Sequence, residues 1–168
     1  MAEAGYKGET VVVLHPTDHP TAGAALLTAA NLKKIGVNVE LQALDWATLG
    51  SRRTNKGEPT KGGWSIFHTR WDGLLSSPLS LVPMSGACDK AWFGWPCDPE
   101  MEKLRAAFSR ETDPAKQKEL ALAVSDRIMN QAQYVVLGQY LAFGAYRKDR
   151  VDGWLPSPAA VWWNISKK

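Results

Sequence analysis

The residues best suited to bind a ligand follow a short aromatic and β-branched stretch in the first half of the chain. Trp64 to His68 has the composition of a buried strand, and the glycine pair Gly62-Gly63 before it suits a turn. Thr69 to Pro78 contains glycine, serines and a proline, which predicts a loop. In an α/β sheet, ligands bind beyond the carboxyl ends of the strands. We therefore expect a binding site in the first four residues of this loop, Thr69, Arg70, Trp71 and Asp72.

Metal and catalytic chemistry have little support in the residue pattern. His15 and His19 lie four apart, a spacing that clamps a metal on a helix, but Pro16 and Pro20 argue against a helix there. The sequence has no Gly-x-Ser-x-Gly elbow, no phosphate loop ending in Gly-Lys-Ser/Thr, and no Gly-x-Gly-x-x-Gly after a strand. Most carboxylates fall at expected helix starts, where capping explains them. We expect no metal site, no cofactor and no enzymatic activity.

The two cysteines, Cys88 and Cys97, lie in a stretch rich in glycine, tryptophan and proline. Two cysteines alone cannot complete a structural zinc site. We favour a local disulfide between them, which implies an oxidising compartment. Two reduced, unrelated thiols are the alternative.

The chain has eight tryptophans, a high count for its length. Trp46 and Trp71 each fall where an element begins or ends beside a loop, and for these two both ligand contact and packing are open interpretations. The other rings in irregular segments are expected to hold loops onto a core. These are Trp92, Trp95, Trp154, Trp162 and Trp163.

Composition places the chain among globular proteins with a real core. Its 168 residues fit one domain, and 45% hydrophobic with 22% charged residues is ordinary for this class. The net charge of +3 includes no basic run beyond the pairs Arg52-Arg53 and Lys167-Lys168, so we expect no nucleic-acid partner. No apolar run approaches the roughly 20 residues that span a bilayer.

The elements that would carry the site alternate between strand and helix. Thr10 to His15 is a continuous apolar run, typical of a strand covered on both faces. A helical pattern starts at Thr21 and ends near Gly36, and Val37 to Leu44 alternates like a second strand. Strand, helix and strand in this order predict a parallel crossover.

Capping signals predict the remaining helices. Asp45 is placed to cap a helix from Trp46 to about Asn55, and Asp98-Pro99 and Asp113-Pro114 each mark another helix start. Tyr134 to Leu137 is typical of a further strand. The fold class is α/β, a parallel or mixed sheet flanked by helices.

Five segments stand out along the chain in this order: KKIGVNVELQALDWATL, the strand ending in Trp71, FGWPCDPEMEKL, YVVLGQYLAFGAYRKDRVDGW and VWWNISK. Together they resemble the C-terminal lobe of the peptide-type extracellular solute-binding proteins (family 5) that serve ABC importers. The similarity runs from near Glu3 to the last residue.

The resemblance implies that residues 1–168 form a single α/β lobe of a two-lobed protein, of the type II periplasmic-binding-protein fold. The missing N-terminal lobe would form the other half of the ligand cleft, and the tail, residues 152–168, would return toward it. A signal peptide would then belong to the part that precedes this chain, and the protein would be periplasmic. The implied function is to capture a small solute between the lobes and to deliver it to a membrane permease.

The resemblance also implies site residues, position by position. The aromatic residue that opens the second helix matches Trp46, and an arginine of oligopeptide binders matches Arg53. A basic strand-end position matches His68, and the cleft tryptophan matches Trp71. An isolated lobe would supply only half of the ligand contacts, so we expect weak or undetectable binding by this chain alone.

The sequence departs from the family where peptide binders carry Gly-Trp-x-x-Asp, whose aspartate holds the α-amine of the peptide. Arg70 replaces the glycine, Asp72 directly follows the tryptophan, and Leu74 stands where the aspartate would fall. The solute therefore stays open among a peptide, an opine, an oligosaccharide and a metal complex.

Two other classes of function are alternatives. A flavodoxin-like enzyme domain would need a cofactor or catalytic cluster at the same strand ends. A carbohydrate-binding module would use exposed tryptophans as sugar platforms, but most such modules are β-sandwiches, and a parallel sheet argues against one.

Overall fold

The computed structural model describes residues 3, 5–73, 76–141, 143–155, 157 and 161–168. The chain divides into two compact units, Met1–Arg70 and Trp71–Lys168. The division falls directly before Trp71, inside the loop that is predicted to form a binding site.

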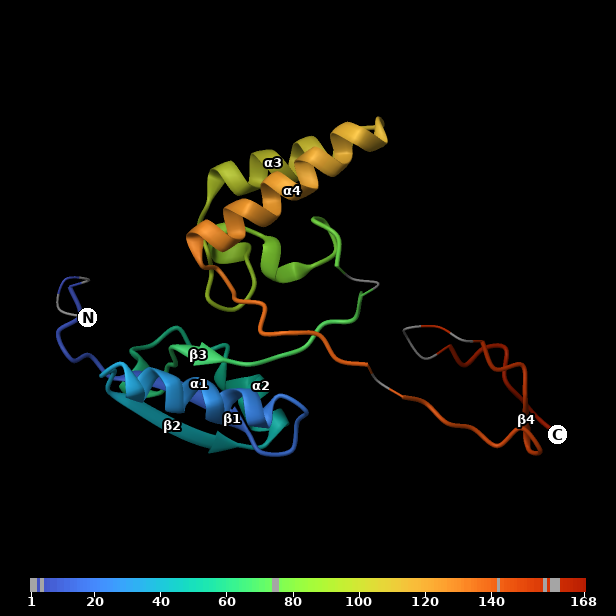
Figure 1. Cartoon of the computed structure of the whole chain (residues 1–168), viewed down its shortest axis with the longest axis horizontal. Helices are drawn as coiled ribbons and strands as arrows, with labels where there is room; N and C mark the ends of the chain where they lie inside the picture. The colour runs from blue at the N-terminus through green and yellow to red at the C-terminus, as the bar shows by residue number, and fades with distance from the viewer. Residues whose placement is uncertain (1–2, 4, 74–75, 142, 156, 158–160) are drawn as a thin grey trace. The chain divides into compact units, whose positions relative to one another are not determined.

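The first unit contains a three-stranded parallel sheet (Figure 1). Its strands are β1 (Val11–Pro16), β2 (Val39–Leu44) and β3 (Ile66–Phe67), in the spatial order β2-β1-β3. β1 pairs with β2 over its whole length, from Val11 opposite Val39 to Pro16 opposite Leu44. The central position of β1 explains its apolar run, because Val12, Val13 and Leu14 are fully buried. The predicted parallel crossover is confirmed.

Helix α1 (Ala22–Lys34) makes that crossover and lies along the sheet in Figure 1. Ala25 and Ala29 are its buried residues, and these small side chains let the helix approach the strands closely. The helix ends as predicted, since Gly36 adopts a φ of 86° that an L-residue rarely takes.

Helix α2 (Trp46–Arg52) follows β2 and is capped as predicted. The Asp45 side chain accepts hydrogen bonds from the Thr48 backbone N–H at 2.9 Å and from the Thr48 hydroxyl at 2.5 Å. Leu49 of this helix is fully buried with Val12 and Leu14. This cluster is the core beneath the carboxyl ends of the strands.

β3 is shorter than the predicted strand over Trp64 to His68. The Val12 N–H donates to the Ser65 hydroxyl at 3.1 Å instead of to a backbone carbonyl, so regular pairing begins only at Ile66. The Ser65 N–H still donates to the Val12 carbonyl at 2.9 Å. A short 3₁₀ turn, η2 (Pro59–Lys61), precedes this strand.

The second unit centres on two helices that lie side by side in Figure 1, α3 (Pro99–Arg110) and α4 (Pro114–Gln131). Both begin with the predicted Asp-Pro signal. The preceding segment contributes Leu81 and Met84 to their core and forms two 3₁₀ turns, η4 (Val82–Met84) and η5 (Cys88–Lys90). The buried residues of this core are Leu81, Met84, Met101, Val124 and Ile128.

The predicted strand at Tyr134 to Leu137 is wrong. Within the described residues no strand pairs with this segment, and a strand is stable only with a partner for its backbone groups. Tyr134 packs against the helical core, but Val135, Val136 and Leu137 are 62–66% exposed. Their β propensity alone does not make a strand.

The last residues form a small two-stranded antiparallel ribbon, β4 (Val151–Asp152) with β5 (Ser166–Lys167). Trp154 is half-buried and stacks on Tyr146, with ring centroids 5.2 Å apart. Trp162 and Trp163 are 66% and 84% exposed, which is the opposite of the packing role expected for them. How the tail, residues 152–168, relates to a second lobe stays a prediction.

Candidate ligand site at the strand ends

Three connections meet at the carboxyl edge of the parallel sheet in the first unit. The segment Thr17 to Thr21 follows β1, Asp45 and Trp46 follow β2, and His68 to Arg70 follow β3. This is the edge at which open α/β sheets bind their ligands. The sheet order β2-β1-β3 places the loop after β1 between the other two.

Trp46 is the centre of an aromatic and cationic cluster at this edge. The His19 imidazole stacks on its ring with centroids 3.9 Å apart and planes 12° from parallel. The Arg53 guanidinium carbon lies 5.6 Å from the Trp46 ring centroid and 5.7 Å from that of Phe67, within cation–π range of both rings. The Asp18 carboxylate accepts a hydrogen bond from the Trp46 N–H at 2.7 Å, which ties the loop after β1 to the start of α2.

His19 is held in its stacked position by the turn that leads into α1. Its Nδ1 accepts a hydrogen bond from the Thr21 N–H at 3.3 Å and lies 2.9 Å from the Thr21 hydroxyl. Burial lowers the pKa of His19, the positive charge of Arg70 lowers it further, and Asp18 opposes them. The imidazole is therefore neutral at pH 7 and offers a flat, uncharged ring next to two cations.

The Arg53 side chain is partly withdrawn from water, and burial lowers its pKa. A guanidinium keeps its charge even so. Arg52, its neighbour, has a structural role, because its Nη2 donates to Gln42 Oε1 at 2.9 Å and to the Gly63 carbonyl at 3.1 Å. Of the two adjacent arginines, Arg53 is the one that faces the aromatic cluster.

His68 is buried, with 7% of its surface exposed. Its Nε2 lies 2.9 Å from the Thr28 hydroxyl of α1, and its backbone carbonyl accepts from the Thr21 hydroxyl at 3.4 Å. Burial lowers the pKa of the imidazole, so it is neutral at pH 7. These contacts join the end of β3 to α1, and the role of His68 toward a ligand stays a prediction.

The remaining predicted site residues divide between the two units. Thr69 is half-buried and Arg70 exposed at the end of the first unit. Trp71 and Asp72 begin the second unit, where Trp71 packs on Trp92 with ring centroids 5.5 Å apart. Asp72 is exposed, and its backbone carbonyl accepts from the Ser76 hydroxyl at 3.4 Å. Leu74, at the position of the family aspartate, lies outside the described residues.

The structure thus brings Trp46 and Arg53 together and adds His19 to them, and it places Arg70 near enough to His19 for its charge to lower the pKa of that imidazole. Sequence reasoning considered His19 only as a metal ligand. Its place directly after β1, at the same sheet edge as Trp46, was the signal that could have found it. Among the described residues no group of three or more histidines, cysteines or carboxylates could hold a metal. The arrangement is chemically suited to packing against an apolar group and to fixing a negative charge beside it.

The predicted disulfide between Cys88 and Cys97 is present in the second unit. In the part of the chain that is described, no helix combines the length and the apolar character needed to cross a membrane.

The comparisons with known proteins agree with this architecture. Residues of the chain are 35% identical, over 167 positions, to the "Probable peptide ABC transporter periplasmic-binding protein y4tO" of Sinorhizobium fredii strain NGR234. That alignment covers 98% of this chain. The chain is a homologue of the peptide-type periplasmic-binding proteins of ABC transporters. It covers 31% of the length of the Sinorhizobium protein, so it corresponds to one part of such a protein.

Two further similar proteins support the homology. The "Di/tripeptide-binding protein 4" of Pseudomonas aeruginosa strain UCBPP-PA14 is 28% identical over 146 residues, covering 85% of this chain and 26% of that protein. The solved structure of MppA, titled a periplasmic murein tripeptide-binding protein in its unliganded open form, superposes with a TM-score of 0.63. It is 25% identical and matches 79% of this chain and 25% of its own. No family model matches the chain.

The similarity to these proteins bears out the predicted resemblance and the α/β fold, with a parallel sheet flanked by helices. It does not test the individual site residues. The chain spans about a quarter to a third of the length of the relatives it matches, so the activity of a whole binding protein enters only as a proposal.

Proposed function

We propose that this chain is one lobe of the solute-binding component of an ABC importer. Residues 1–168 would form a lobe that closes on a small solute together with a second, N-terminal lobe, and the loaded protein would deliver the solute to its membrane permease. The protein would be exported to the periplasm and would perform no chemistry on the solute. The names of the relatives favour a peptide as the solute, with an opine, an oligosaccharide or a metal complex as the other candidates.

One observation carries the proposal: the stacked pair of His19 and Trp46 beneath the guanidinium of Arg53, at the carboxyl edge of the sheet. The two flat rings form an apolar wall, and the guanidinium is a fixed cation beside it. A few placed polar groups on a mostly apolar surface are typical of a small-molecule site. Arg70 and His68 of the first unit would add polar fixing points. In the second unit, Trp71 would contact the solute with its apolar ring and Asp72 with its carboxylate.

The exposed apolar side chains of the second unit favour the proposal that a second lobe covers them. Leu141 and Phe143 are 79% and 92% exposed, and with Trp163 they present apolar surface that a soluble protein normally buries. The homologues are about three times as long as this chain, which leaves enough polypeptide for a second lobe to cover that surface.

The test is solute binding by the two-lobed protein, purified from the periplasm and released from any retained ligand by mild denaturation. Mass spectrometry of the released material identifies the solute class. Titration calorimetry with that solute then compares the wild type with Arg53→Lys, which keeps the charge but loses the planar group over Trp46. Arg110→Lys, at the exposed end of α3, is the matched control.

We expect Arg53→Lys to weaken binding about tenfold, as the loss of one oriented cationic contact does, and Arg110→Lys to leave it unchanged. The 168-residue chain alone should bind the same solute weakly or undetectably, because closure needs contacts from both lobes. Submicromolar binding by this chain alone, or equal affinity of the Arg53→Lys protein, would contradict the proposal.

A further inference from the structure

Trp71 has a defined aromatic partner inside the second unit. Its ring meets that of Trp92 edge to face, with centroids 5.5 Å apart and planes at 66°. Trp92 in turn contacts Phe93, with centroids 5.3 Å apart. Trp71 remains 37% exposed, so part of its ring stays open while Trp92 packs against another part. Edge-to-face pairs of this kind have a preferred geometry and restrict the rotation of both rings.

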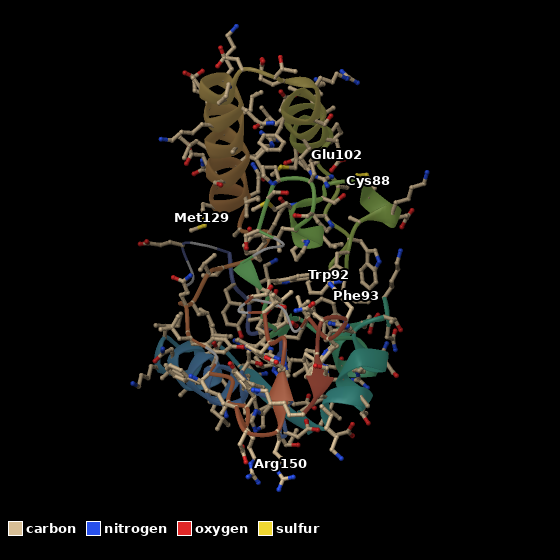
Figure 2. All side chains as sticks on the ribbon, turned by 90° about the vertical axis from the view of Figure 1, so that its right-hand side faces the viewer. Cys88, Trp92, Phe93, Glu102, Met129 and Arg150 are labelled. Atoms are coloured by element: carbon tan, nitrogen blue, oxygen red, sulfur yellow. A yellow bond between two sulfur atoms is a disulfide. The ribbon has the colours of Figure 1, made fainter. Side chains whose placement is uncertain are left out.

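Trp92 belongs to a loop that is closed at its base. The Cys88–Cys97 disulfide joins the two ends of the loop, and Ala87 pairs with Cys97 as an isolated bridge beside it. The Cys88 N–H also donates to the Pro96 carbonyl at 3.0 Å. Figure 2 shows Trp92 and Phe93 next to each other on this loop, on the side of Cys88 away from Glu102 of α3.

Inside the loop, the backbone turns tightly around Trp92. The Trp95 N–H donates to the Trp92 carbonyl at 2.8 Å, and Trp95 itself adopts a positive φ of 46°. The Ala91 N–H donates to the Cys88 carbonyl at 2.9 Å. These bonds hold the loop backbone on both sides of Trp92.

The base of the loop is fastened to both helices of the second unit. The Gly86 N–H donates to Glu102 of α3 at 2.7 Å, and the Asp98 N–H donates to the Gly86 carbonyl at 2.9 Å. The Asp98 carboxylate forms a two-pronged ion pair with Arg127 of α4, at 2.6 and 2.7 Å. A Cβ at position 86 would lie 2.7 Å from the Asp98 carbonyl oxygen, so the close approach of these two backbone segments requires glycine at this position. The loop is therefore an extension of the rigid helical pair.

We propose that Trp92 is a positioning residue for Trp71. The disulfide-closed loop would present Trp92 as a fixed wall, and Trp92 would set the orientation in which Trp71 offers its open face to the solute. This inference rests on the proposed function, in which Trp71 contacts the solute. It assigns the loop from Cys88 to Cys97 a part in solute binding, without direct contact between that loop and the solute.

The primary test needs no solute. The full protein is labelled with 5-fluorotryptophan, and the ¹⁹F resonance of Trp71 is assigned by its loss in Trp71→Phe. We expect this resonance to move toward the position of free 5-fluorotryptophan in Trp92→Leu, and to stay near its wild-type position in Trp92→Phe, which retains an aromatic ring. Trp163→Leu, which removes an 84%-exposed tryptophan of the tail, is the matched control and should leave the Trp71 resonance in place.

The double variant Cys88→Ser/Cys97→Ser tests the loop itself and also serves if Trp92→Leu fails to fold. We expect the Trp71 resonance to shift in this variant as well, while the circular dichroism of the helices is retained. An unchanged Trp71 resonance in Trp92→Leu or in the folded double cysteine variant would overturn the proposal, as would an equal shift in Trp163→Leu.

Affinity measurements then connect positioning to binding, with trialanine as the probe. Loss of one edge-to-face contact corresponds to about a 3- to 10-fold weaker Kd for Trp92→Leu, with recovery in Trp92→Phe. If the wild type does not bind trialanine while the ¹⁹F shifts occur as expected, the peptide assignment fails and the positioning of Trp71 by Trp92 stands. If the wild type binds and Trp92→Leu binds equally well, the positioning role is refuted and the proposed function stands.

Discussion

Replacement of Asp98 by alanine should destabilise the second unit more than loss of a helix cap alone. The Asp98 carboxylate caps α3 by accepting from the Glu100 and Met101 N–H groups at 3.1 and 3.2 Å. It also pairs with Arg127 of α4, and its side chain is only 12% exposed. One carboxylate therefore starts one helix and ties it to the other.

The chain contains a matched control in Asp113. Its carboxylate caps α4 in the same way, accepting from the Ala115 and Lys116 N–H groups at 2.8 and 3.2 Å, and within the described residues it forms no ion pair. Loss of a cap costs about 1 kcal/mol. Hydrogen bonds to a charged partner add about 1.5–3 kcal/mol, reduced here because the pair is partly solvated. We expect about 1 kcal/mol for Asp113→Ala and about 2–3 kcal/mol for Asp98→Ala.

Hydrogen–deuterium exchange of peptides from α3 and α4 measures the effect of each lost cap locally, without assuming that the two units unfold together. These free energies correspond to about 5-fold faster exchange for Asp113→Ala and about 30- to 150-fold for Asp98→Ala, since 1.4 kcal/mol is a factor of ten. Equal rates in the two variants would refute the reasoning, because they would mean that the Asp98–Arg127 pair contributes nothing beyond the cap.

The same pair predicts a pH dependence of known sign. The hydrogen bonds from Arg127, with those from the Glu100 and Met101 amides, hold the pKa of Asp98 below its ordinary value, although burial opposes them. The stability that the ionised Asp98 carboxylate contributes is therefore complete above about pH 4, and it is lost as the pH falls through the lowered pKa of Asp98 in the folded state. Urea unfolding of the wild type should lose stability over this acidic range, and Asp98→Ala should lose less.

Two further predictions concern the first unit. Burial lowers the pKa of His68, and its Nδ1 has no hydrogen-bond partner among the described residues. The stability that the neutral ring contributes above about pH 6.5 should therefore fall as the pH decreases through the lowered folded-state pKa. His68→Gln should flatten the pH dependence of urea unfolding in this range, and an unchanged slope would argue against this reasoning. Gly63→Ala should destabilise by about 3 kcal/mol or more, because its Cβ would lie 2.0 Å from the Gly57 carbonyl oxygen. Gly50→Ala, in α2 with open space around its Cβ, should instead stabilise by about 1 kcal/mol, and similar unfolding midpoints for the two alanine variants would contradict the prediction.

Local sequence determined the helices and the central strand. Asp45, Asp98 and Asp113 each mark a helix start, because a short carboxylate accepts hydrogen bonds from amides that the first helical turn leaves unpaired. The apolar run of β1 predicted a strand buried on both faces, and the strand–helix–strand order predicted its parallel pairing with β2. These features depend on neighbours within a few residues, so the sequence alone carries them.

The candidate site was predicted only in part. The start of α2 beside a loop marked Trp46, the family resemblance marked Arg53, and the structure brings the two side chains together. His19 reaches Trp46 across a separation that no local pattern records. The pairing of Trp71 with Trp92 was equally invisible, because a loop and a disulfide bring the two rings together.

Only the tertiary structure decided which apolar and polar groups are buried. Val135 to Leu137 has strong β propensity, yet it remains exposed because the described chain offers it no partner strand. His68 is a polar residue at a strand end, yet its ring is buried against Thr28 of α1. Propensity and capping act within a few residues, whereas burial depends on surfaces brought together from distant parts of the chain. For that reason the sequence alone predicted the elements and their order, and the contacts that shape the site required the fold.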